Sequence, residues 1–71
     1  MSEPLTKRQK QIFDFLVVYQ TKWGVAPTLR EIADSFKFKS ATAQYMIGQL
    51  TVKGYIKNYP KKARGLEIIN G

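Results

Sequence analysis

Residues 40–52 form an uncharged stretch in the more basic half of the chain. They contain no Asp, Glu, Lys or Arg, and their polar groups are hydroxyls, two amides and one phenol. A solvated helix face usually carries Lys and Glu instead. An amide can form two hydrogen bonds with an adenine edge, and a threonine can bond a base or touch a thymine methyl. These residues therefore suit hydrogen bonding to bases better than bond-making chemistry.

The same stretch has the apolar spacing of a helix. Ala43, Ile47 and Leu50 recur at i, i+4 and i+7, which predicts one buried stripe with Met46 packed at its edge. The opposite face is then expected to present Ala41, Thr42, Gln44, Tyr45, Gly48 and Gln49. The hypothesis is that this face reads base edges. The alternative that stays open is an ordinary polar surface, since base contacts are identified only in a complex.

The positive charge of the chain is concentrated after residue 35. Twelve Lys and Arg against five Asp and Glu give a net charge of +7, and seven of the bases but no acid lie between Ser35 and Leu66. Such a one-sided excess attracts polyanions. We predict phosphate contacts from Lys37, Lys39, Lys53, Lys61, Lys62, Arg64 and Arg8. The alternatives are charge that serves solubility and charge that protects a sheet edge.

Several function classes are excluded by residue types. The chain has no Cys and no His, and only five carboxylates, which are scattered. It therefore offers no disulfide, no evident nucleophile relay or acid–base pair, and no metal cluster, so we expect no enzyme and no cofactor. No apolar segment is long enough for a signal peptide or a membrane span. We expect a cytoplasmic protein, associated with the nucleoid or, if phage-encoded, in the host cytoplasm.

The uncharged stretch belongs to a series of elements that we expect to form one domain over residues 1–71. Helical spacing of apolar residues predicts helices over about 7–22, 29–36 and 41–52. After Gly54 the period changes to alternation, which predicts strands over about 55–59 and 66–69, joined by a basic turn. The predicted fold class is mainly α with a small β-hairpin.

Cap residues bound these helices. Thr6 with Gln9 and Thr28 with Glu31 have the spacing of capping boxes. Gly24 suits a left-handed residue after the first helix, and Gly54 suits the same position after the third. Ser40 is expected to cap the third helix.

Two short helices joined by a tight turn, with bases around the second helix, are typical of a helix-turn-helix. Its second helix fits the major groove of DNA, where each base pair shows a distinct pattern of donors and acceptors. With the hairpin as a wing, the sequence predicts a winged helix-turn-helix. We therefore predict a sequence-specific regulator of transcription that binds double-stranded DNA.

The chain also resembles the N-terminal DNA-binding domain of the LexA repressor over nearly its whole length. The resemblance is carried, in order, by Leu5-Thr6-Lys7-Arg8-Gln9, Ile12-Phe13-Asp14-Phe15, Gly24, Pro27-Thr28, Arg30-Glu31-Ile32-Ala33, Phe38-Lys39-Ser40, Lys53-Gly54, Arg64-Gly65 and Ile68. It implies a winged helix-turn-helix and bacterial or phage transcriptional control, often of damage-response (SOS) genes. It also implies base contacts at the start of the third helix, which map onto Ser40, Ala41 and Thr42 with a one-place ambiguity, and at Gln44 and Tyr45.

Three departures from the family pattern bear on function. The chain is one residue shorter between Phe38 and Leu50, and its base-reading residues differ, so we expect a different operator. Lys37 stands where the turn usually has glycine, and a left-handed lysine there would cost about 1 kcal/mol unless the turn takes another shape. The family's self-cleaving, dimerising C-terminal half is not in the sequence, so we expect an excised domain or a stand-alone relative. Such a chain would pair weakly on DNA or need a dimerisation partner.

Two other binding functions are weighed against duplex DNA. As a protein adaptor, aimed at a host repressor or RNA polymerase, the chain would use Tyr45, Met46, Tyr55 and Tyr59 as anchors, since aromatics and Met are enriched in interface cores. The simpler interpretation is that Tyr55 and Tyr59 pack the sheet. Binding of RNA or single-stranded DNA would favour several stacking aromatics on a sheet, and the chain offers one short hairpin.

Overall fold

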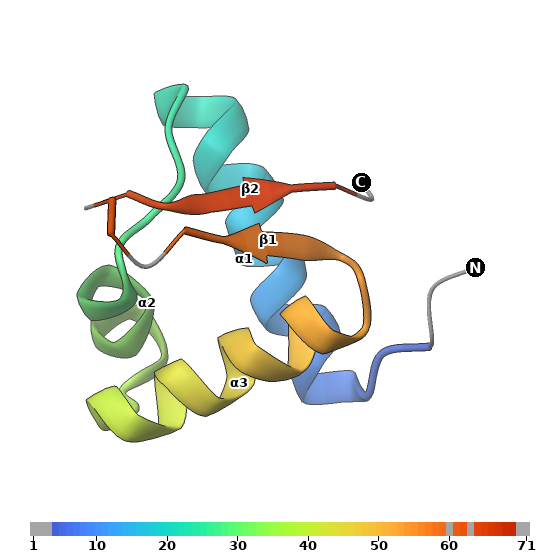
Figure 1. Cartoon of the computed structure of the whole chain (residues 1–71). Coiled ribbons are helices and arrows are strands. Elements are labelled where there is room, and N and C mark those ends of the chain that lie inside the picture. Colours follow the sequence, from blue (N-terminus) through green and yellow to red (C-terminus); the bar gives the residue numbers. More distant parts are fainter. Residues whose placement is uncertain (1–3, 60, 63, 70–71) are drawn as a thin grey trace.

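Three helices lead into a two-stranded hairpin (Figure 1). The computed structural model describes residues 4–59, 61–62 and 64–69. The elements are α1 (Lys7–Trp23), α2 (Leu29–Phe36), α3 (Ser40–Val52), β1 (Ile56–Asn58) and β2 (Leu66–Ile68). The predicted fold class, a winged helix-turn-helix, is confirmed.

Helix α1 begins and ends at the expected caps. The Thr6 hydroxyl accepts a hydrogen bond from the Gln9 backbone N–H at 3.2 Å, and the Gln9 side chain accepts one from the Thr6 N–H at 3.1 Å. This exchange satisfies two of the backbone donors that a helix start leaves unpaired. At the other end Gly24 has φ 76°, the left-handed conformation that glycine adopts without strain.

Helix α2 begins at a second capping box and ends in a strained turn. The Glu31 N–H donates to the Thr28 hydroxyl at 3.1 Å, and the Glu31 carboxylate accepts from the Thr28 N–H at 2.8 Å. After the helix Lys37 is left-handed, with φ 58° and ψ 40°. The turn therefore has the conformation that strains Lys37 and not an alternative shape that would avoid the strain. The turn is closed by the Phe38 N–H, which donates to the Ala33 carbonyl at 2.8 Å.

The expected Ser40 cap is wrong. Helix α3 already begins at Ser40, and Lys39 occupies the cap position with an extended backbone (φ −73°, ψ 156°). In the part of the chain that is described, no side chain caps this helix start. The physical reason is that lysine has no side-chain acceptor for the first N–H groups. The start of α3 is therefore held by packing and by its own backbone bonds.

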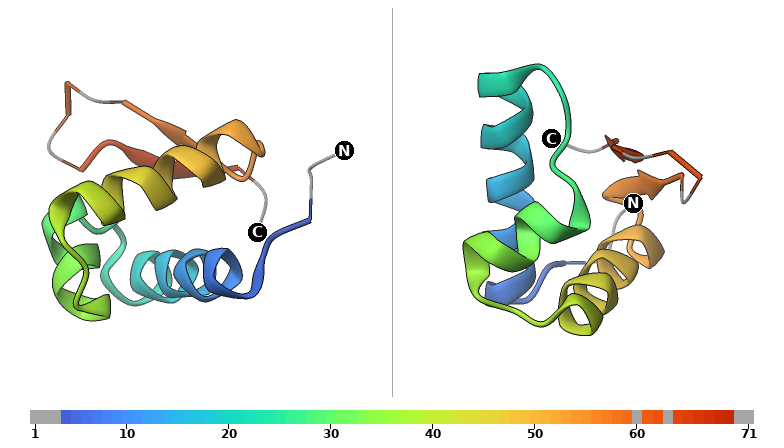
Figure 2. Two further views of the ribbon diagram at one scale, coloured as in Figure 1. Left: turned by 90° about the horizontal axis from the view of Figure 1, so that it is seen from below. Right: turned by 90° about the vertical axis from the view of Figure 1, so that its left-hand side faces the viewer.

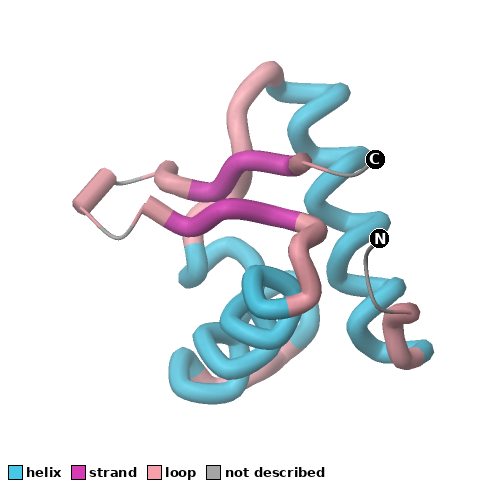
Figure 3. The backbone as a smooth tube through the Cα atoms, turned by 45° about the vertical axis from the view of Figure 1, so that its right-hand side comes forward, coloured by secondary structure: helices cyan, strands magenta, loops and turns pink. Residues whose placement is uncertain are grey.

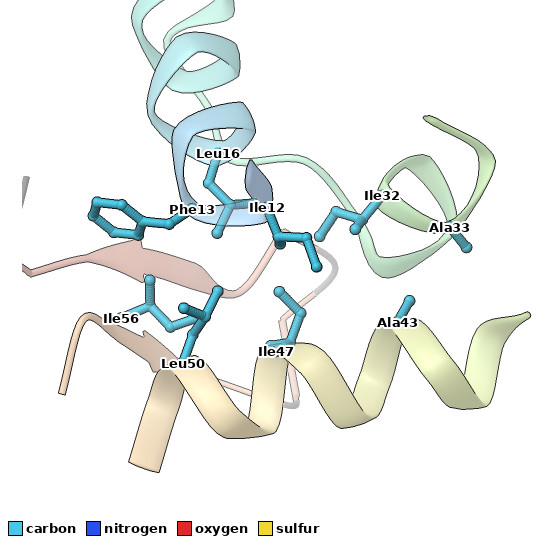
Figure 4. Close-up of a cluster of buried hydrophobic side chains, with 9 residues drawn as sticks. All are labelled: Ile12, Phe13, Leu16, Ile32, Ala33, Ala43, Ile47, Leu50 and Ile56. Carbon is cyan, nitrogen blue, oxygen red and sulfur yellow. The ribbon is translucent and has the colours of Figure 1, made fainter. Parts of the chain in front are cut away.

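The core lies where the three helices meet β1. Ile12 and Leu16 of α1 point toward α3, and Phe13 extends beside the hairpin (Figure 4). They meet Ile47 and Leu50, which are fully buried as the helical spacing predicts. The remaining members of the buried cluster are Ile32, Ala33, Ala43 and Ile56. Burial of one stripe of α3 against this cluster fixes which of its faces points outward.

The hairpin pairs antiparallel, with Ile56 opposite Ile68 and Asn58 opposite Leu66 (Figure 3). The strands are shorter than predicted, although the Tyr59 N–H donates to the Gly65 carbonyl and the Ile69 N–H to the Tyr55 carbonyl, at 2.6 and 2.9 Å. Pairing thus continues one step beyond each end of the regular ladder. A Cβ at Gly65 would collide with the Tyr59 carbonyl oxygen, so glycine is required where the strands separate.

The hairpin packs beside α3, and α1 and the hairpin lie on opposite sides of the core in both views of Figure 2. Helix α3 runs along the lower edge of Figure 1, below α1, with one long face turned away from the other elements. Among the described helices, none combines the length and apolar composition needed to cross a membrane.

Candidate nucleic-acid interface

The outward face of α3 carries the residues predicted for base reading. Ser40, Ala41, Thr42 and Gln44 are exposed, and Gln49 is half-buried. Tyr45 is 64% exposed. The buried stripe is Ala43, Ile47 and Leu50, with Met46 half-buried at its edge. The helix therefore divides as its spacing predicts, with an apolar stripe inside and uncharged groups outside.

Sequence reasoning missed Val52, which extends this outward face. Val52 is 81% exposed and lies seven residues after Tyr45, so both side chains stand on the same side of α3. Its position just outside the apolar periodicity of Ala43, Ile47 and Leu50 was the available signal. The outward face thus ends in an exposed aliphatic group.

A hollow of about 380 Å³ joins α3 to the wing and to the start of α2. It is lined by Gln44 of α3, Asn58 and Lys62 of the hairpin, and Arg30 of α2, among others. Arg30 and Asn58 were not predicted as site residues. Arg30 is an exposed base at a helix start, but nothing in the sequence indicates that the hairpin returns to α2. The hollow places two cations and two amides around one concave surface.

Arg64 is held by the protein itself. Its guanidinium donates to both carboxylate oxygens of Glu31, at 2.7 and 3.2 Å, and to the Ala26 carbonyl at 3.0 Å. The hydrogen bonds from Arg64 and from the Thr28 backbone lower the pKa of Glu31 to about 2. The hydrogen bond with Glu31 in turn raises the pKa of Arg64. Arg64, which the sequence predicted to contact a phosphate, thus connects the wing to α2.

Lys53 also has partners within the fold. Its ammonium donates to the Gln9 side-chain oxygen at 2.6 Å and to the Pro4 carbonyl at 3.0 Å. Gln9 is buried and belongs to the capping box of α1. Lys53 therefore connects the end of α3 to the start of α1. The separation of 44 positions in sequence explains why spacing alone did not reveal the contact.

The other predicted phosphate-binding bases are exposed around α3. Lys37 and Lys39 lie in the turn before the helix, and Lys61 and Lys62 lie at the wing tip. The Lys62 ammonium is 5.3 Å from the centre of the Tyr59 ring. Arg8, at the start of α1, is exposed with its guanidinium 5.6 Å from the centre of the Phe38 ring. Residues 60 and 63 of the expected wing turn lie outside the described part of the chain.

Tyr59, which directly follows β1, also stabilises the wing. Its hydroxyl donates to the Glu67 carboxylate at 2.8 Å, and this bond raises the pKa of Tyr59. With Lys62 beside its ring, Tyr59 joins the wing tip to β2. In the described ranges, no three His, Cys, Asp or Glu side chains gather to hold a metal ion.

Comparison with known proteins identifies a family whose model matches this sequence. The model of the family described as LexA DNA binding domain matches residues 2–65. The LexA repressor of Staphylococcus haemolyticus is 43% identical over 68 residues, which cover 93% of this chain and 32% of that protein. The LexA repressor of Desulfatibacillum aliphaticivorans is 38% identical over 94% of this chain and 34% of its own length. The chain thus spans about a third of the curated relatives it matches.

Proposed function

This chain belongs to the family of LexA DNA-binding domains, and we propose that it binds duplex DNA as a sequence-specific repressor of transcription. The observation that carries the proposal is the outward face of α3, which is exposed, free of charged residues and bordered by exposed lysines. A helix with this face fits the major groove, and the lysines suit the phosphates on either side. The relatives are named repressors, which supports the direction of regulation.

Within the proposal, side chains on α3 contact the DNA bases, and basic side chains around α3 bind the phosphates. The base-reading set is Ser40, Ala41, Thr42, Gln44, Tyr45 and Gln49. The phosphate-binding set is Arg8, Lys37, Lys39, Lys61 and Lys62, with Arg30 added because it borders the hollow beside Gln44. Phosphate contacts fix the register of the protein on DNA and carry no direct sequence information.

Lys53 and Arg64 take a different role in the proposal. Their cationic groups are already bonded to Gln9 and Glu31, and withdrawal of either would leave a polar partner without its bond. We therefore assign Lys53 to positioning the end of α3 and Arg64 to positioning the wing. Both residues act on DNA binding through the groups that they hold in place.

The proposed partner is double-stranded DNA, with a second copy of the chain on the other half of an inverted repeat. Such copies would stand one helical turn apart, or a multiple of it, because the recognition helices must reach the same side of the duplex. The adaptor alternative loses one of its anchors, because the Tyr55 ring packs against Phe13 with ring centroids 5.3 Å apart. The comparisons support neither the adaptor function nor a phage origin.

Binding of a random duplex over a salt series tests the proposal. Five to six phosphate contacts would lower affinity by about 10³-fold between 50 and 200 mM salt, because each contact releases condensed counterions. Fluorescence anisotropy of a labelled duplex measures this slope. Absence of binding at low salt would overturn the proposal, while selection from a random pool would reveal whether the enriched site is an inverted repeat.

A further inference from the structure

We propose that α3 selects half-sites rich in A·T pairs and lacks the side chains that select G·C pairs. This inference rests on the proposed function and specifies which DNA the same surface recognises. It is carried by three features of α3: the absence of charge, the apolar row on its outward face and the two amides beside that row.

The first feature is the absence from α3 of the charged side chains that recognise G·C pairs. Guanine is most often read by Arg or Lys, which donate to its O6 and N7, and cytosine by Asp or Glu, which accept from its N4 amino group. None of these four residue types occurs in the 13 residues of α3. Lys53 and Arg64, which border the helix and the wing, are already bonded to Gln9 and Glu31. The helix itself therefore carries none of the strongest G·C-reading groups, and the exposed Lys37 and Lys39 in the turn before it belong to the proposed phosphate-binding set.

The second feature is an outward row of apolar or small groups. Ala41, Tyr45, Gly48 and Val52 follow one another at steps of four, three and four residues, which places them on one side of the helix. Tyr45 and Val52 are among the most exposed hydrophobic side chains, at 64% and 81%. The major-groove edge of thymine carries a methyl group that apolar side chains contact. This row is complementary to thymine methyls.

The third feature is an amide on each side of that row. Gln44 precedes Tyr45 by one position and Gln49 follows it by four, which is 100° in one direction and 40° in the other around the helix axis. Gln44 also borders the hollow shared with Asn58 and Lys62. A glutamine that faces adenine can donate to N7 and accept from N6. The row and the amides together therefore match A·T pairs of either orientation.

Selection from a random duplex pool at one fixed salt concentration tests the base preference. The expected result is an enriched half-site with consecutive A·T pairs at its centre. Enrichment of G·C pairs would overturn this inference and leave the proposed function intact. Binding with no enriched motif would overturn both this inference and the sequence specificity of the proposed function. Failure to bind any duplex at low salt would overturn the proposed function itself.

Single-atom changes in the selected site test the contacts. Replacement of a contacted thymine by deoxyuridine removes only the methyl and is expected to weaken binding about fourfold. Replacement of a contacted adenine by 7-deazaadenine removes the N7 acceptor and is expected to weaken binding at least fivefold. Unchanged affinity for every such duplex would overturn the inference.

A matched pair of protein variants completes the test. Gln44→Ala should relax the preference for adenine at one position, whereas Gln20→Ala, an exposed glutamine on α1, should leave the enriched site unchanged. Gln44→Arg adds the side chain that reads guanine and should move that position toward G. If Gln44→Ala selects the same site as the unaltered chain, Gln44 does not read adenine and the inference fails.

Discussion

Arg64 of the wing donates hydrogen bonds to both carboxylate oxygens of Glu31 at the start of α2, at 2.7 and 3.2 Å. A guanidinium paired with a carboxylate in this two-bond geometry fixes orientation as well as distance. Glu31 at the same time completes the capping box of α2 through the Thr28 N–H. One carboxylate thus couples the wing to the first helix of the helix-turn-helix.

Acid should loosen this coupling. The pKa of Glu31 in the folded protein is about 2, below its ordinary 4.5. The ionised carboxylate therefore stabilises the fold above pH 4.5, and this contribution is lost as the pH falls from 4.5 toward 2. Thermal unfolding of Glu31→Gln should depend less on pH in that window than unfolding of the unaltered chain.

The pKa itself can be followed by NMR of the Glu31 carboxyl carbon. In Arg64→Ala the pKa should rise toward 4.5, because the largest cause of the depression is removed. Lys10→Ala, which removes a base from the exposed pair with Asp14 on α1, is the control and should leave the Glu31 value near 2. A Glu31 pKa that stays near 2 in Arg64→Ala would show that the guanidinium is not its cause.

The wing lysines should act through phosphates alone. Lys61→Ala combined with Lys62→Ala is expected to weaken binding to all duplexes alike and to flatten the log–log salt slope by up to about 2. Lys22→Ala, beside Trp23 at the far end of α1, is the matched control and should leave the slope unchanged. A changed sequence preference in the wing variant would instead assign base reading to the wing.

Lys53 should affect stability rather than salt dependence. Lys53→Met removes the bonds to Gln9 and Pro4 and is expected to lower the free energy of unfolding by about 1 kcal/mol. Lys7→Met, an exposed lysine at the start of α1, controls for the loss of one positive charge. Urea unfolding and the salt slope are measured on both. A flatter slope with unchanged stability would return Lys53 to the phosphate-binding set.

Local sequence signals predicted the elements and the inner face of α3, because caps and helical spacing act over a few residues. Thr6, Thr28 and Gly24 illustrate this, as does the stripe of Ile47 and Leu50. The contacts of Arg64 and Lys53 within the fold were not predicted because their partners Glu31 and Gln9 lie 33 and 44 positions away. For such basic residues, charge alone does not reveal whether the side chain bonds to a partner within the protein or to a DNA phosphate.

The left-handed Lys37 offers a stabilising substitution. Glycine occupies this conformation without the clash of a Cβ, so Lys37→Gly should raise the free energy of unfolding by about 0.5–1 kcal/mol. Ser35→Gly, two positions earlier on the exposed side of α2, should lower it by about the same amount because that backbone is helical. Urea unfolding separates the two. Equal loss in both variants would mean that Lys37 is not strained.

Gly48 provides the sharpest separation of stability from binding. Glycine in a helix interior costs about 0.5–1 kcal/mol relative to alanine. A Cβ at this position would meet no atom of the described residues within 4 Å, so packing does not require glycine there. Gly48 instead lies in the outward row between Tyr45 and Val52, where under the proposed function the missing side chain would let the edge of the DNA groove approach closely. Gly48→Ala should therefore raise the free energy of unfolding by about 0.5–1 kcal/mol and yet weaken duplex binding.

Gly24→Ala is the matched control for this substitution. A Cβ at Gly24 would also meet no described atom within 4 Å, but its φ of 76° strains any other residue. Gly24→Ala should therefore lower stability by about 1 kcal/mol and leave duplex affinity unchanged under conditions where the protein stays folded. Urea unfolding and anisotropy with the same duplex measure both properties. A more stable Gly48→Ala that binds as tightly as the unaltered chain would show that DNA does not approach α3 at this position.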